Sequence, residues 1–163
     1  MSLDAQVNAN AATWLDREMT SESSFPLAQS GFGREVRDAI AARKRWLIDQ
    51  KLMRVDAGKT IYRSDLLAVL ARRELDQAGQ KLAGERQIPF RMMADGERIA
   101  GSYKQSIDLV SGKYAIVENA YEFSLVPWRP VMDKELGREV VATVRGNDIS
   151  WEFGRKRGLG IGL

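Results

Sequence analysis

The sequence predicts an α+β fold, with helices in the first half of the chain and a small sheet in the second. Up to about residue 86, apolar side chains recur every three or four positions, which is typical of amphipathic helices. From residue 90 onward, apolar and polar side chains alternate, as they do in strands with one buried face. Pro89 lies between the two patterns and separates them, because proline does not continue a helix.

The first expected helix covers residues 4 to about 19. Val7, Ala11 and Leu15 recur there at helical spacing, which predicts one apolar face. Residues 20–33 then contain Ser, Pro and Gly at the density of a loop, so we expect the helix to end before them.

The second expected helix, residues 33–52, carries the most specific charge pattern in the chain. Val36, Ile40 and Leu47 fall on one stripe, which predicts the buried side. Four basic residues fall within an arc of roughly 100° beside that stripe, at ~100° per residue. Such segregated charge indicates nucleic-acid binding, and the solvent-exposed side of an ordinary amphipathic helix explains it at least as well. The four residues are Arg34, Arg37, Lys44 and Arg45.

Two short strand-like runs in residues 52–63, on either side of "DAG", predict a β-hairpin next to this helix. A helix followed by a basic hairpin is partly winged-helix-like, since the hairpin of a winged helix contacts the phosphate backbone. The likeness is partial because loop signals occupy residues 20–33, where a winged helix needs another helix. Ser64 is a suitable N-cap for a third long helix, which we expect to end near Gly84.

The second half of the chain predicts three strands, one short helix and two more strands. Strand patterns fill residues 99–126 in three segments and return on either side of the turn at 146–147. Pro130 and Gly137 suit the start and the end of the short helix. Because closure removes the exposed edges of short strands, we expect a small five-stranded β-barrel. This order of elements favours an OB-like barrel, with an SH3-like barrel as the alternative.

These elements predict a helical subdomain with a hairpin at residues 4–86, a small β-barrel at 87–155 and a basic, Gly-rich tail at 156–163. The tail has the pattern of a truncated C-terminus, so we expect this chain to be part of a longer protein. No run approaches the ~18 to 20 apolar residues that span a bilayer, and no signal segment opens the chain. The pattern therefore predicts a cytoplasmic protein without membrane insertion.

The composition excludes much familiar chemistry. The 163 residues include no Cys and no His, which excludes the usual zinc sites and His-activated nucleophiles. "AGKT" at residues 57–60 lacks the first Gly of a phosphate-binding loop, so we expect no nucleotide cofactor and no metal. Asp148, Glu152 or Glu118 could act as a general acid or base, but no telling spacing pairs them.

Charge is uneven along the chain. Residues 34–59 hold eight basic and four acidic side chains, whereas residues 87–153 hold eight basic and ten acidic ones. If nucleic acid binds, we therefore expect contacts from the helical half and the C-terminal tail, through salt-sensitive interactions with phosphates. The candidate nucleic-acid-binding residues are Arg34, Arg37, Lys44, Arg45, Lys59, Arg63, Arg155, Lys156 and Arg157.

Five segments spread over nearly the whole chain carry a resemblance. They are "ATWLDRE" at 12–18, "GFGREVRDAIAARKRWLIDQKL" at 31–52, "YRSDLLAVLARREL" at 62–75, "SLVPWRPVMDKELGREV" at 124–140 and "ISWEFGRKRG" at 149–158. Together they resemble the uncharacterised C-terminal domain of plasmid relaxases, the mobilisation nucleases of conjugative and T-DNA transfer. In such relaxases the nicking chemistry belongs to an N-terminal domain with a nucleophilic Tyr and a His-bound metal, and this chain has no His to take that role.

The resemblance implies a non-catalytic accessory domain that supports DNA binding in conjugative plasmid mobilisation. Its expected partners are DNA and relaxosome or type IV secretion coupling proteins. A rival hypothesis is a protein-interaction module that docks a coupling or relaxosome accessory protein, with the basic arc merely solvated. A third hypothesis is a carboxylate-based enzyme.

Overall fold

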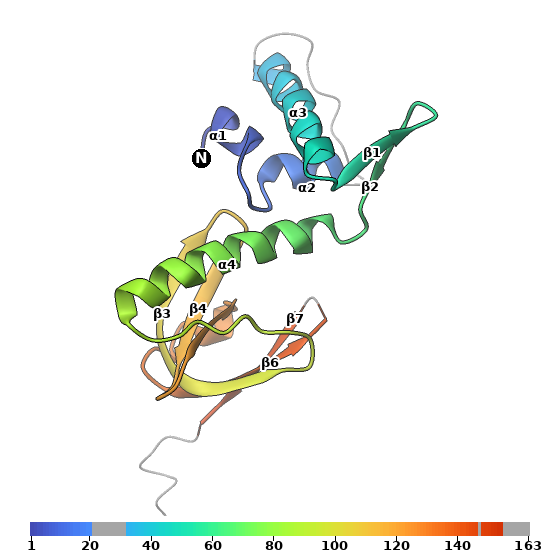
Figure 1. Cartoon of the computed structure of the whole chain (residues 1–163). Coiled ribbons are helices and arrows are strands. Elements are labelled where there is room, and N and C mark those ends of the chain that lie inside the picture. Colours follow the sequence, from blue (N-terminus) through green and yellow to red (C-terminus); the bar gives the residue numbers. More distant parts are fainter. Residues whose placement is uncertain (21–31, 147, 155–163) are drawn as a thin grey trace, which may run out of the picture. The chain divides into compact units, whose positions relative to one another are not determined.

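The computed structural model describes residues 1–20, 32–146 and 148–154 and confirms the α+β class (Figure 1). The chain forms two compact units, Met1–Glu74 and Leu75–Leu163, here called the N-terminal and C-terminal units. The division falls inside one helix, α4 (Leu66–Arg86), so each unit takes part of it. No helix in the described ranges is both long enough and apolar enough to cross a membrane.

The N-terminal unit contains three further helices and a hairpin. They follow the chain as α1 (Leu3–Val7), α2 (Trp14–Thr20), α3 (Phe32–Asp49), β1 (Met53–Asp56) and β2 (Lys59–Tyr62). The predicted hairpin is confirmed: β1 and β2 pair antiparallel across a turn in which Ala57 and Gly58 both have positive φ, at 49° and 76°. Such a turn matches the twist of the strands that it joins.

The single helix expected over residues 4–19 is wrong, because the chain leaves the helical path between α1 and α2. Thr13 and Asp16 start the second helix through a reciprocal cap. The Thr13 N–H donates to Asp16 Oδ2 at 2.8 Å, and the Asp16 N–H donates to Thr13 Oγ1 at 3.3 Å. Each side chain thereby satisfies a backbone donor that a helix start leaves unpaired.

The core of the N-terminal unit confirms the stripe predicted for α3. Val36 and Leu47 are buried, and Ile40 is partly buried. α3 ends where the chain turns into the hairpin, and Lys51 adopts a positive φ of 61° in that turn. The buried cluster that contains Leu47 of α3 consists of Ala12, Leu47, Leu52, Met53, Leu66 and Leu70.

The C-terminal unit contains the five expected strands in one antiparallel sheet, with the order β5-β4-β3-β6-β7. The first strand of the unit is therefore central and pairs with both the second and the fourth. A single 3-10 turn, η1 (Pro130–Met132), replaces the longer helix expected between the third and fourth strands. The strands are β3 (Arg98–Leu109), β4 (Gly112–Glu118), β5 (Phe123–Pro127), β6 (Glu139–Arg145) and β7 (Asp148–Phe153).

The sheet is not closed into a barrel, which corrects the expectation of a closed one. β5 and β7 are its two edges, and no backbone ladder joins them. One side-chain bond connects them instead: the Trp151 indole Nε1 donates to the Pro127 carbonyl oxygen at 3.2 Å. The edges thus approach each other without the register of hydrogen bonds that a barrel requires.

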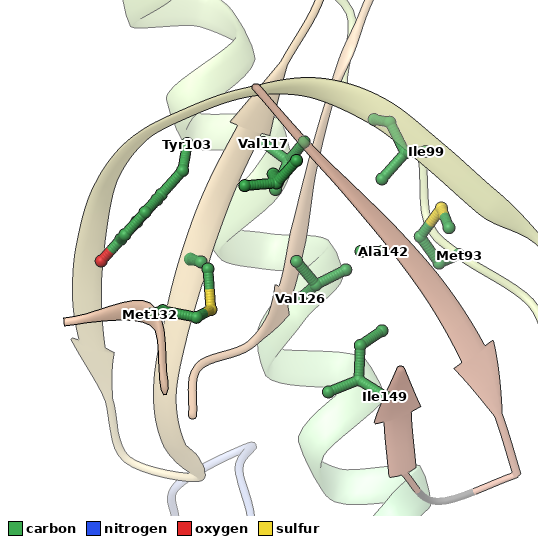
Figure 2. Packing of buried hydrophobic residues seen from close by; sticks show 10 residues of the cluster. Met93, Ile99, Tyr103, Val117, Val126, Met132, Ala142 and Ile149 are labelled. Carbon is green, nitrogen blue, oxygen red and sulfur yellow. The ribbon is translucent and has the colours of Figure 1, made fainter. Parts of the chain in front are cut away.

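Both faces of this sheet are covered. One face packs a cluster that includes Tyr103, Val117, Val126 and Met132, seen in Figure 2. The other face carries Tyr114, Ile116, Phe123 and Leu125, which pack against apolar side chains of α4 and of the segment that follows it. These covering residues are Leu75, Ala78, Leu82, Ala83, Ile88 and Phe90.

Candidate nucleic-acid interface

The four basic residues of the predicted arc lie on the solvent side of α3. Arg34 and Arg45 are exposed, while Arg37 and Lys44 are partly buried at the margin of the same side. We call these four residues the basic face. Its position follows from the helical period, since the buried residues Val36 and Leu47 form the neighbouring stripe of α3.

A fifth cation of α3, Arg43, points the other way and is fully buried. Its Nε and Nη2 donate to the two carboxylate oxygens of Asp16, both at 2.8 Å. The remaining donors reach four backbone carbonyls at 2.7 to 3.0 Å, and the guanidinium lies 4.2 Å from the centre of the Trp46 ring. Arg43 therefore fixes α3 against the first two helices. The four carbonyls belong to Gln6, Val7, Ala9 and Ala11.

Three members of the basic face are available for an external anion. Within the described ranges, Arg34, Lys44 and Arg45 make no ion pair with any carboxylate. By contrast, Arg63, another predicted contact, is held by Asp65 through an exposed ion pair of 2.6 Å. Exposed pairs of this kind contribute little and exchange readily with other anions.

The other predicted contacts divide between the hairpin and the C-terminal tail. Lys59 is exposed and lies opposite Asp56 across the hairpin turn. It thus belongs to the same unit as the basic face. The predicted contacts Arg155, Lys156 and Arg157 lie outside the described residues.

A small pocket at the base of the hairpin contains residues that the sequence did not single out. The pocket, here called the hairpin pocket, has a volume of about 270 Å³ and lies where the turn after α3 meets both strands. The sequence gives only a weak signal for this pocket, because Lys51 and Arg54 contribute to the basic excess of residues 34–59 but belong to no motif. Its lining consists of Lys51, Leu52, Met53, Arg54, Ile61, Tyr62 and Arg63.

Apolar surroundings also alter one group of this pocket. Tyr62 is half-buried, and desolvation raises the pKa of its phenol above the ordinary value of 10.0. The ring therefore stays neutral at physiological pH. Tyr62 therefore adds no negative charge to the lining of the hairpin pocket.

The three carboxylates weighed for catalysis lie in the C-terminal unit and are not brought together as an acid–base pair. Glu118 pairs with Arg86 at 2.6 Å, and Glu152 is exposed on β7. The pKa of Asp148 is lowered by the hydrogen bond from the Ile149 N–H and by the Arg129 side chain. Over the described residues, no group of three or more Asp and Glu side chains could hold a metal ion.

Comparison with known proteins gives one match. A family model described as "Protein of unknown function (DUF3363)" matches residues 1–160. No curated protein and no solved structure matches the chain.

Proposed function

Since this chain belongs to DUF3363, a family of proteins of unknown function, we propose its function from its own residues. The proposal is a non-catalytic, cytoplasmic accessory domain of a DNA-transfer relaxase, which supports DNA binding through the basic face of α3. The relaxase part rests on the sequence resemblance alone. The DNA-binding part rests on the charge and exposure of the basic face.

The single observation that carries the proposal is that α3 has both a buried cation with a structural role and exposed cations without one. Arg43 is buried and satisfied within the unit, whereas Arg34 and Arg45 are exposed without an ion pair in the described ranges. From Arg34 to Arg45 the helix rises ~16 Å, at about 1.5 Å per residue, which corresponds to roughly five phosphate steps of one DNA strand. A helix face of this length suits a run of phosphate contacts.

The C-terminal unit supports an OB-like assignment in outline, and the N-terminal unit a partly winged-helix-like one. A central first strand and a helical turn between the third and fourth strands favour the OB-like over the SH3-like alternative. OB-folds bind oligonucleotides on the outer face of strands two and three. Here that face of β4 and β5 is covered by α4 and Phe90, so we assign DNA binding to the N-terminal unit.

Docking of a relaxosome or coupling protein is the second candidate. Two exposed apolar side chains favour it: Val131 within η1, at 59%, and Leu136 shortly after η1, at 62%. Exposed apolar side chains gather where proteins bind one another. Replacing both with Ser should abolish capture of such a partner and leave DNA binding unchanged.

The test of DNA binding is an anisotropy titration of labelled duplex and single-stranded DNA at two salt concentrations. Reversing two charges of the basic face, in the double variant Arg34→Glu and Arg45→Glu, should weaken binding at least tenfold at low salt, because both cations face the phosphates. Wild-type affinity should fall steeply as salt rises. Thermal stability should stay unchanged, since neither side chain is buried.

A matched control reverses two exposed lysines of the other unit, Lys104→Glu and Lys134→Glu. This variant has the same net charge as the first and should bind DNA within twofold of wild type. Equal losses in both variants would mean that only net charge matters, and an unchanged affinity in the first would remove α3 from the interface.

A further inference from the structure

The hairpin pocket combines an apolar wall with a cationic rim. Leu52 and Met53 are buried, and Ile61 adds exposed apolar surface on the same face of the hairpin as Arg54. Lys51, Arg54 and Arg63 are exposed. The pocket therefore suits a ligand with a flat or apolar part and a negative charge beside it.

We propose that the hairpin pocket binds one unpaired base of a DNA strand, with the neighbouring phosphate held by Lys51 and Arg54. This inference rests on the proposed function and adds the form of DNA that is bound. A strand with unpaired bases is the ligand, because a base stacked inside an uninterrupted duplex cannot enter a pocket.

The size of the pocket fits a single base. Its volume of about 270 Å³ lies just below the roughly 300–1,000 Å³ of pockets that hold whole small molecules. The Ile61 side chain, next to the buried Leu52, offers apolar surface against which an unpaired base can pack, as apolar side chains do in pockets that hold extruded bases.

The charge of the pocket fits a phosphate. No carboxylate lines it, and in the described part of the chain Lys51 and Arg54 form no ion pair. Arg63 is paired with Asp65 outside the pocket lining, which leaves the first two cations for the ligand. Such cations form strong, charge-assisted hydrogen bonds with phosphate oxygens.

The continuity of α3 with the hairpin favours DNA over a peptide. α3 leads directly into β1, as Figure 1 shows, and Lys51 lies in the turn between them. A strand whose phosphates follow the basic face to Arg45 therefore arrives near the hairpin pocket. A hydrophobic peptide with a free C-terminal carboxylate would use the pocket alone and would have no use for the basic face.

The experiment compares two single-stranded probes on the whole chain. One is an oligothymidylate, and the other is an abasic oligomer of equal length with the same phosphates. By competition anisotropy, the oligothymidylate should bind at least tenfold more tightly to the wild type, because only it offers bases. In Ile61→Glu that ratio should fall to about one, since a charged side chain replaces part of the apolar wall.

Val55→Glu is the matched control. Val55 is 58% exposed on the neighbouring strand, pairs with Thr60 and does not line the pocket. Side chains alternate along a strand, so Val55 and the Arg54–Ile61 pair lie on opposite faces of the hairpin. The control adds the same charge as Ile61→Glu and should keep the wild-type ratio.

The possible failures are distinguishable. Equal wild-type affinity for the two oligomers would overturn the pocket but not the proposed function, whereas no binding of any DNA would overturn both. Loss of the ratio in both variants would overturn the assignment to this pocket. If a leucine-ending peptide binds only with its carboxylate free and only when Ile61 is present, the pocket serves a protein partner and the proposal is overturned.

Discussion

Among single residues, neighbouring cations of α3 have opposite roles. Arg43 and Lys44 are adjacent in sequence, yet Arg43 is fully buried and Lys44 belongs to the basic face. Helical spacing predicts this division, because the two positions lie ~100° apart around the axis. The partners of Arg43 were not predictable, since Asp16 and the carbonyls that it binds lie at least 27 residues away along the chain.

Replacing Arg43 with Lys should destabilise the N-terminal unit strongly. A single ammonium cannot hold both oxygens of Asp16 and four carbonyls, so buried polar atoms would lose their partners. We expect the free energy of unfolding to fall by about 3–5 kcal/mol, measured by urea denaturation. Arg45→Lys, at an exposed position two residues away, should change it by less than about 0.5 kcal/mol. Similar values for the two variants would contradict the structural role of Arg43.

At the scale of elements, periodicity predicted which helices and strands exist better than it predicted where a helix is interrupted. The hairpin, α3 and the strands of the sheet follow from local patterns and turn residues. The break over residues 8–13 does not, because Arg43 takes carbonyls that a continuous helix would bond internally. The length of the helix expected between Pro130 and Gly137 was likewise overestimated, and the structure has only the three-residue turn η1 there. Pro130 marks where a helix starts but not how far it runs.

Two glycines of α4 should respond oppositely to Ala. A Cβ at Gly79 would overlap the ring of Phe90, whereas a Cβ at Gly84 meets nothing within 4 Å. Gly84→Ala should therefore stabilise the C-terminal unit by up to ~1 kcal/mol through helix propensity. Gly79→Ala should destabilise it by about 1–3 kcal/mol through overpacking. Thermal unfolding of both variants measures the difference, and a stabilised Gly79→Ala would disprove the close contact between α4 and Phe90.

On the scale of the whole molecule, strand patterns cannot show whether a sheet closes. The alternation in β7 predicted a strand with one buried face, and that face is the same in a barrel or an open sheet. Closure depends on whether the two edge strands share a register, which is a non-local property. The division of the chain is non-local as well, since nothing in the sequence of α4 marks the boundary after Glu74.

Fragments of the chain should reflect this division. A fragment that starts at Leu75 keeps the part of α4 that covers Tyr114 and Phe123, and we expect it to be soluble and folded. A fragment that starts at Gln87 loses that cover and should aggregate, because several large apolar side chains become exposed. Size-exclusion chromatography and dye binding compare the two. A soluble, monomeric fragment from Gln87 would show that the sheet does not need α4.

The buried pair of Asp16 and Arg43 has a consequence for inheritance across the family. A descendant that lost only one partner would retain an isolated charge in its interior, so changes at these two positions must occur together or not at all. The exposed cations Arg34 and Arg45 are not coupled to a buried partner in this way. Each can be substituted independently, according to the ligand that each relative binds. In an alignment of DUF3363 sequences, positions 16 and 43 should therefore change together. Positions 34 and 45 should instead vary independently of each other, and stay basic only in relatives that bind an anionic ligand there.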